Sequence, residues 1–144
     1  MAEDESLQIL VEIVSAMGLV APYFDEKYTP DAYCVMKLAD VEGDHQTLHQ
    51  TKVCRKSYDP IWTVKTNSLY LFRTSMKDLM ASEGLLFQVN HNDMLGAKVF
   101  SHGSAKVPSQ KIIRSKGKRV EFPLMVKKKR KGKTFDIFQK VRKY

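Results

Sequence analysis

Short runs of apolar residues recur along the chain, and stretches rich in turn-forming residues separate them. Several runs alternate apolar and polar positions or are rich in β-branched residues, which is typical of strands. Eight runs have this character: residues 7–14, 32–38, 47–55, 61–72, 85–89, 103–107, 119–126 and 134–141. Residues 75–83 predict a short helix in one connection. The pattern predicts an all-β antiparallel sandwich or barrel, because strands and helices do not alternate as a parallel sheet requires.

The length and composition of the chain limit what it can be. Its 144 residues, of which 43% are hydrophobic, are enough for one domain with a real core. No apolar run approaches the ~20 residues of a membrane span, and the acidic start lacks the basic-then-apolar order of a signal peptide. Cys34 and Cys54 lie in strand-like runs, which favours buried free thiols and fits a reducing cytosol. We predict a single domain over residues 1–144, whether alone or at the start of a longer protein.

The net charge of +8 is unevenly distributed along the sequence. Residues 1–110 hold 10 basic and 14 acidic residues, whereas residues 111–144 hold 14 basic and 2 acidic ones. The stretch KKKRKGK, residues 127–133, supplies six of these positive charges. Such an asymmetry indicates an anionic partner, which could be a membrane, a nucleic acid or an acidic protein.

Two aspartates, Asp25 and Asp31, lie between the first two predicted strands. Carboxylates at this spacing are consistent with a cation site, since calcium takes about six to eight oxygen ligands. They are also consistent with loop structure that involves no ligand. The aspartates alone leave both interpretations open.

The order and spacing of several short motifs resemble those of the C2 domain family. They are the opening run LQILVEIVSAMGL with the loop ending at Asp31-Ala32-Tyr33, the turn SYDPIW, the run LLFQVNHND and the late run RVEFPL. The resemblance covers almost the whole chain. It implies an eight-stranded antiparallel Greek-key β-sandwich. The position of the first and last strands resembles the permuted topology found in phospholipases.

In this family two loops hold calcium, one through two aspartates and the other through three. Asp25 and Asp31 match the first pair, but the second loop has two asparagines and Lys98 at the matching positions. Each of these changes removes a negative charge, and an ammonium group at ~5 Å repels a divalent cation by several kcal/mol at an effective dielectric constant of ~20. We therefore expect calcium binding to be weak or absent and no cofactor to be required; Lys98 is an alternative, internal partner of the aspartates. The residues of this weak or vestigial calcium site are Asp25, Asp31, Asn90, Asn92 and Asp93.

The basic stretch and the loop tips together predict a membrane-binding surface. If each strand reverses the chain, the connections 17–31, 56–60, 90–101 and 127–133 lie at one end of the sandwich, which usually faces the membrane in this family. Each Lys or Arg near an anionic leaflet contributes roughly 1 kcal/mol. The alternatives are a solvated turn or a nuclear-import signal for the basic residues, and core packing for some tips. The basic residues are Lys127, Lys128, Lys129, Arg130, Lys131 and Lys133, and the apolar tips are Tyr23, Phe24, Met94 and Leu95.

A second lipid site of this family is a lysine-rich cluster on the concave sheet, which recognises phosphoinositides. Leu48 and Gln50 stand where further lysines would be expected, so ordinary solvated residues are an equal alternative. The residues at or near the positions of the cluster are Tyr33, Lys37, Lys52 and Arg55, with Trp62 close by.

No catalytic motif is present: there is no Ser-His-Asp order, glycine-rich phosphate loop or pair of catalytic carboxylates. We therefore predict a protein that is not an enzyme. The leading hypothesis is a monomeric, cytoplasmic, peripheral membrane-targeting module that binds anionic phospholipids largely independently of calcium. The alternative is a protein-interaction scaffold domain with a degenerate calcium site. Nucleic-acid binding is less favoured, because the aromatic residues near the basic tail alternate like strand residues instead of forming a stacking platform.

Overall fold

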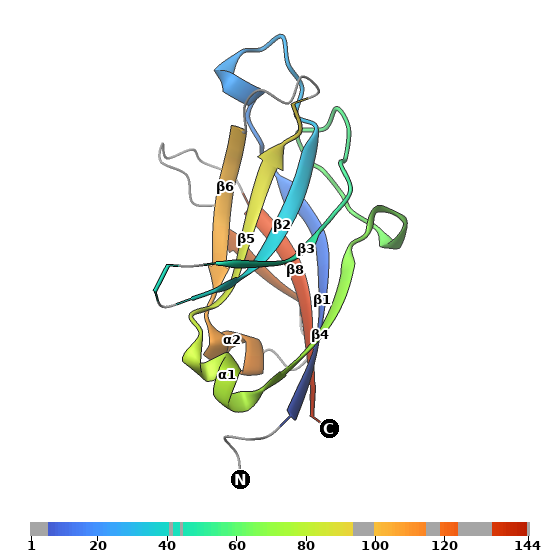
Figure 1. Cartoon of the computed structure of the whole chain (residues 1–144). Coiled ribbons are helices and arrows are strands. Elements are labelled where there is room, and N and C mark those ends of the chain that lie inside the picture. Colours follow the sequence, from blue (N-terminus) through green and yellow to red (C-terminus); the bar gives the residue numbers. More distant parts are fainter. Residues whose placement is uncertain are drawn as a thin grey trace.

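The computed structural model of the chain describes residues 6–40, 42–43, 45–93 and 100–114, and the backbone of residues 119–123 and 134–143 (Figure 1). The strands in these residues are β1 (Ser6–Met17), β2 (Ala32–Ala39), β3 (Gln46–Gln50), β4 (Leu69–Ser75), β5 (Gly84–His91), β6 (Phe100–Val107), β7 (Arg119–Pro123) and β8 (Thr134–Lys143). The helices are α1 (Met76–Ala81), α2 (Ser109–Arg114) and the 3-10 turns η2 (Pro22–Phe24) and η3 (Val64–Thr66).

The strands form two four-stranded sheets in the orders β4-β1-β8-β7 and β3-β2-β5-β6. Neighbouring strands are antiparallel throughout the described residues. The predicted all-β antiparallel sandwich of eight strands is therefore confirmed.

The core lies between the two sheets and follows the period-two pattern of the strands. On β1, the alternate residues Leu7, Ile9, Val11 and Ile13 are fully buried, while the residues between them are half-exposed. Phe87 of β5 faces them from the other sheet and is also fully buried. Each such side chain contributes roughly 1.5–3 kcal/mol by leaving water.

One predicted strand, residues 61–72, is wrong in its first half. Ile61 forms only an isolated bridge with Ser15, and β4 begins at Leu69. The cause is local polar structure: the Thr63 backbone N–H donates to Thr66 Oγ1 at 2.7 Å, which closes the turn of η3. Asn67 then adopts a left-handed φ of 63°.

Trp62 is buried nevertheless. Its backbone N–H donates to the Val14 carbonyl at 2.8 Å, and 2% of its surface is exposed. The predicted strand 47–55 is also shorter, since β3 ends at Gln50. The helix α2 was not predicted.

The connection between α1 and β5 explains why residue 84 is a glycine. Gly84 has a φ of +104°, and a Cβ there would lie 2.0 Å from the Val107 carbonyl oxygen. No other residue fits this position without displacing the backbone of β6. The predicted helix 75–83 is observed as Met76–Ala81, with Ser75 Oγ accepting a hydrogen bond from the Asp78 N–H at 3.0 Å.

The two ends of the sandwich differ in character. The connections β1–β2 and β3–β4 lie at one end, together with the end of β5 and the start of β6, and we call it the loop end. The helices α1 and α2 lie at the other end (Figure 1). Thr134 pairs with both Pro123 and Met17. The chain between β7 and β8 therefore starts and finishes at the loop end.

Candidate functional site

Backbone hydrogen bonds tie together the described parts of three connections at the loop end. The Leu19 N–H donates to the Tyr58 carbonyl at 3.0 Å, and the Ser57 N–H donates to the Pro30 carbonyl at 2.9 Å. The Asn92 N–H donates to the Asp31 carbonyl at 2.8 Å. These contacts join segments that are 27 to 61 residues apart in sequence into one surface.

The tip of the first loop has an unusual backbone. Tyr23 and Phe24 both adopt left-handed conformations, with φ of 59° and 58°. For residues other than glycine each such conformation costs on the order of 1 kcal/mol. The turn places Phe24 in solvent, with 51% of its surface exposed.

Tyr23 is held in place by the second loop. Its hydroxyl donates to Asp93 Oδ2 at 3.3 Å, and its ring packs edge-on against His91 and Phe100, with centroids 6.0 and 5.4 Å apart. Partial desolvation, followed by the charge of Asp93, raises the pKa of Tyr23 above its ordinary value. The hydroxyl therefore stays protonated and remains a donor. The contacts of Tyr23 therefore hold the tip of the loop in place, and this tip exposes the side chain of Phe24 to solvent.

The two aspartates of the first loop accept hydrogen bonds from the backbone. Asp25 Oδ1 accepts from the Lys27 N–H at 3.1 Å, and Asp31 Oδ1 accepts from the Lys56 N–H at 2.8 Å. Lys56 is itself in a left-handed conformation, with a φ of 51°. Asp31 thus stabilises the turn between β3 and β4, and Asp25 stabilises its own loop.

The candidate residues of the second loop are also built into the fold. Asn90 lies within β5 opposite Tyr33 and Ser101, and only 9% of its surface is exposed. Asn92 is half-buried and its N–H donates to Asp31, as described above. Asp93 Oδ2 accepts from Tyr23. Asp25, Asp31 and Asp93 therefore each accept a hydrogen bond from within the protein.

Four large apolar or aromatic side chains are exposed around these loops. They form what we call the loop-end surface: Met17, Phe24, Tyr28 and Tyr58, with exposed fractions of 50%, 51%, 49% and 41%. Phe24 and Tyr58 also line an open hollow of about 290 Å³ together with Val20, Ala21 and Glu26. The sequence analysis identified only Phe24, because the exposure of the other three depends on how the loops pack against each other.

A model of the C2 domain family matches residues 7–124. The chain belongs to the C2 domain family. No curated protein matches the sequence.

Several solved structures share the fold of this C2 domain. The C2A domain of plant extended synaptotagmin 1 has a TM-score of 0.71 at 17% identity, covering 100% of this chain and 98% of that chain. Human GIVD cytosolic phospholipase A2 has a TM-score of 0.71 at 15% identity, covering 98% of this chain and 18% of that chain. For CC2D1B the TM-score is 0.65 at 14% identity, covering 95% of this chain and 55% of that chain.

These identities show the fold alone. The C2 domain spans about half of the CC2D1B chain and less than a fifth of the phospholipase chain. The phospholipase activity of that relative is therefore not carried over to this chain.

The family implies a calcium site, but the described acidic side chains do not gather into one. Among residues 6–93 and 100–114, gaps aside, no group of three or more His, Cys, Asp and Glu side chains lies close enough to hold a metal ion. Asp25, Asp31 and Asp93 instead accept hydrogen bonds from the Lys27 N–H, the Lys56 N–H and the Tyr23 hydroxyl. Lys98, which the sequence analysis placed at this site, lies outside the described residues.

The residues expected at the concave lipid site are spread over two segments. Tyr33 and Lys37 are half-buried on β2, whereas Lys52 and Arg55 are exposed in the loop after β3. Trp62, placed near this site by the sequence, belongs to the core, and its indole N–H donates to the Lys52 carbonyl at 3.1 Å.

Several predicted membrane-contacting residues lie outside the described residues: Met94, Leu95, Lys127, Lys128, Lys129, Arg130, Lys131 and Lys133. The strand ends that flank the six basic residues, Pro123 and Thr134, are paired at the loop end. Within the described part of the chain, no helix is long and apolar enough to cross a membrane.

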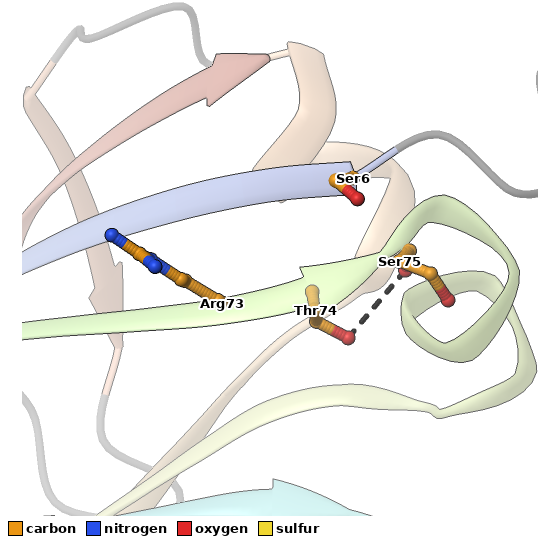
Figure 2. A pocket seen from close by; sticks show the side chains of 4 residues that line it. All are labelled: Ser6, Arg73, Thr74 and Ser75. Atoms are coloured by element: carbon orange, nitrogen blue, oxygen red, sulfur yellow. Dashed lines mark hydrogen bonds between the residues drawn. The ribbon is translucent and has the colours of Figure 1, made fainter. Parts of the chain in front are cut away.

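A further hollow of about 410 Å³ lies away from the loop end, where β1 begins and β4 ends (Figure 2). Its lining is polar and consists of Ser6, Arg73, Thr74 and Ser75. Thr74 Oγ1 donates to the Ser75 carbonyl at 3.5 Å, and Ser75 Oγ caps α1. These side chains serve the local structure of the strand end and the helix start.

Proposed function

We propose that this C2 domain is a peripheral membrane-targeting module that binds anionic phospholipids largely independently of calcium. The observation that carries the proposal is the loop-end surface: four exposed apolar or aromatic side chains lie together at the end where the basic segment starts and finishes. Exposed apolar side chains beside concentrated positive charge are the features of a surface that docks on an anionic leaflet.

The first step is electrostatic capture. Residues 127–133 carry six positive charges, and Lys27 and Lys56 are exposed at the loop end. Each charge near an anionic leaflet contributes roughly 1 kcal/mol, so the six basic residues give at most about 6 kcal/mol. Salt weakens this attraction, since it screens exposed charges beyond about 8–10 Å.

The second step is shallow insertion of the loop-end surface. Phe24 has half of its surface exposed, and burying the remainder contributes on the order of 1 kcal/mol. Tyr28 and Tyr58 combine an apolar ring with a polar hydroxyl, which suits the boundary between headgroups and acyl chains. The left-handed turn at Tyr23 and Phe24 is already formed, so little ordering cost remains at binding.

Neither the capture step nor the insertion step requires calcium in this proposal. Three of the carboxylates that the family resemblance assigns to calcium, Asp25, Asp31 and Asp93, accept hydrogen bonds from the protein, which supports weak calcium binding or none. We therefore propose that the domain requires no cofactor. We also propose that it is monomeric and acts at the cytoplasmic face of a membrane.

Vesicle co-sedimentation tests the proposal. The protein should bind vesicles of phosphatidylcholine with phosphatidylserine in the presence of a calcium chelator, and should bind pure phosphatidylcholine poorly. Replacing the six basic residues of 127–133 by Gln should remove most of the binding while the unfolding transition stays unchanged. If this variant binds as the parent does, or if the parent needs calcium, the proposal fails and the scaffold alternative takes its place.

A pair of matched variants tests the insertion step. Phe24→Ala should increase the dissociation rate from anionic vesicles by several-fold and leave the association rate nearly unchanged, because insertion follows capture. Met80→Ala is the control, since Met80 is similarly exposed, at 46%, but lies on α1 at the opposite end. Equal effects of the two variants would show that the loop-end surface does not enter the membrane.

A further inference from the structure

The chain between β3 and the end of β4 is unusually basic for its position. Residues 51–75 hold five of the 10 basic residues found in residues 1–110, but only one of the 14 acidic ones. That one acid, Asp59, has its Oδ1 engaged by the Gly18 N–H at 2.9 Å. An otherwise acidic part of the molecule thus carries a local positive segment, with the basic residues Lys52, Arg55, Lys56, Lys65 and Arg73.

The same segment displays most of the exposed apolar surface. Among the described residues nine large hydrophobic side chains are exposed, and five of them lie between residues 51 and 75. Tyr58 belongs to the loop-end surface. The other four, which we call the side surface, are Ile61, Val64, Leu69 and Leu71, with exposed fractions of 64%, 70%, 38% and 49%.

The side surface lies on the outer face of the β4–β1 edge of the sandwich. Leu69 and Leu71 pair with Glu12 and Leu10 of β1, while the alternate residues Tyr70 and Phe72 pack against the core. β4 is the last strand of its sheet. After β3 the chain runs to the loop end and then returns along the β1–β4 side of the sandwich to β4 (Figure 1).

The side surface is continuous with the loop-end surface. The Ala16 N–H donates to the Pro60 carbonyl at 3.0 Å, and the Leu19 N–H donates to the Tyr58 carbonyl at 3.0 Å. Residues 58–61 therefore run beside residues 15–19, which include the exposed Met17. One exposed apolar region thus extends from the loop tips onto the side of the sandwich.

We propose that the side surface is a second contact with the anionic leaflet, so that the domain docks tilted onto its β1–β4 side. The inference rests on the proposed function and specifies the orientation of docking. Two observations favour a lipid leaflet as the occupant: the apolar residues alternate with basic residues along the segment 51–75, and they continue the surface that inserts. Tilting brings the positive segment 51–75 close to the anionic headgroups, where charge attraction is strongest.

Probes at single cysteines test this orientation. In a Cys54→Ser background, Val64→Cys, Phe24→Cys and Met80→Cys variants are each labelled with an environment-sensitive dye; Cys34 is fully buried and should not react. On vesicles of phosphatidylcholine with phosphatidylserine, the emission maximum of the dyes at positions 64 and 24 should shift to the blue. Nitroxide-bearing lipids should quench the fluorescence of both dyes. The dye at position 80 should do neither.

An unlabelled variant provides an independent measurement. Ile61→Gln with Val64→Gln should weaken binding to these vesicles by about tenfold, given the exposed area of the two side chains. The unfolding transition should not change, because both side chains are already in solvent.

The outcomes separate this inference from the proposed function. If the dye at position 24 responds and the dye at position 64 does not, the tilt is wrong and membrane docking stands. If neither responds, both fail. A response at position 64 that grows with protein concentration in the absence of vesicles would assign the side surface to a second copy of the chain and overturn the inference. A response at position 80 equal to that at position 64 would overturn it as well.

Discussion

Replacing Asp31 by Asn and by Ala distinguishes the two roles that a loop aspartate can have in this C2 domain. If Asp31 stabilises the turn, as its hydrogen bond indicates, Asn should largely replace it, because an amide oxygen also accepts a hydrogen bond. If Asp31 served mainly as a calcium ligand, the loss of charge in Asn would matter almost as much as the loss of the whole group in Ala.

The structure sets the expected magnitude. Asp31 Oδ1 accepts from the Lys56 N–H at 2.8 Å, and Lys56 is held in a left-handed conformation. A hydrogen bond to a charged acceptor contributes about 1.5–3 kcal/mol, and exposure of Lys56 reduces this. We expect Asp31→Ala to lower the free energy of unfolding by about 1–2 kcal/mol and Asp31→Asn to lower it by less than about 1 kcal/mol.

Urea unfolding followed by the fluorescence of Trp62, the one tryptophan in the sequence, measures both variants. The control pair is Asp40→Asn and Asp40→Ala, since Asp40 Oδ1 accepts from the Glu42 N–H at 3.1 Å outside the calcium-type loops. A second arm adds 1 mM calcium. A site with a Kd of about 10 µM would raise the stability of the parent by about 2.7 kcal/mol, and we expect no such increase.

The reasoning is refuted by one combination of results. Calcium would have to stabilise the parent but neither Asp31 variant, and Asn would have to be as damaging as Ala. The carboxylates would then be cation ligands first and turn-stabilising groups second.

Three further predictions concern the body of the sandwich. Gly84→Ala should destabilise the fold by more than about 3 kcal/mol in urea unfolding, because its Cβ would lie 2.0 Å from a carbonyl oxygen of β6. Gly43→Ala, which has a positive φ of +84° but no atom within 4 Å of its Cβ, should cost only about 1–2 kcal/mol. Burial raises the pKa of the Cys34 thiol far above its ordinary value, so a thiol reagent should modify only Cys54 in the native protein and both in denaturant. Because the unfolded thiol ionises first, stability should fall as the pH rises above about 8.5. Acrylamide should quench Trp62 weakly, with or without vesicles, since it is buried.

The sandwich could be predicted where a strand buries one face. β1 shows this best: its alternating apolar residues predicted a strand over 7–14, and the observed strand is Ser6–Met17. The segment after Pro60 is as apolar as a strand, but Thr63, Thr66 and Asn67 form a capped turn there. The six residues of α2 are too few to display a helical period.

The positions of the loop aspartates were visible in the sequence, but their partners were not. Asp31 accepts a hydrogen bond from a residue 25 positions away in sequence, and Asp93 accepts one from a residue 70 positions away. Such contacts depend on how the connections pack in three dimensions, which no local pattern encodes. The exposure of Tyr58 was missed for the same reason.

The strained tip of the first loop is held by contacts within the protein. Two left-handed residues cost on the order of 2 kcal/mol together, and the conformation persists because other contacts offset the cost. Those contacts are internal: the Tyr23 hydroxyl is bonded to Asp93, and its ring packs on His91 and Phe100. Because these donors belong to the protein itself, we propose that the tip keeps this arrangement without a cation. Binding should therefore respond to the charge of the leaflet and the salt concentration, and only weakly to calcium.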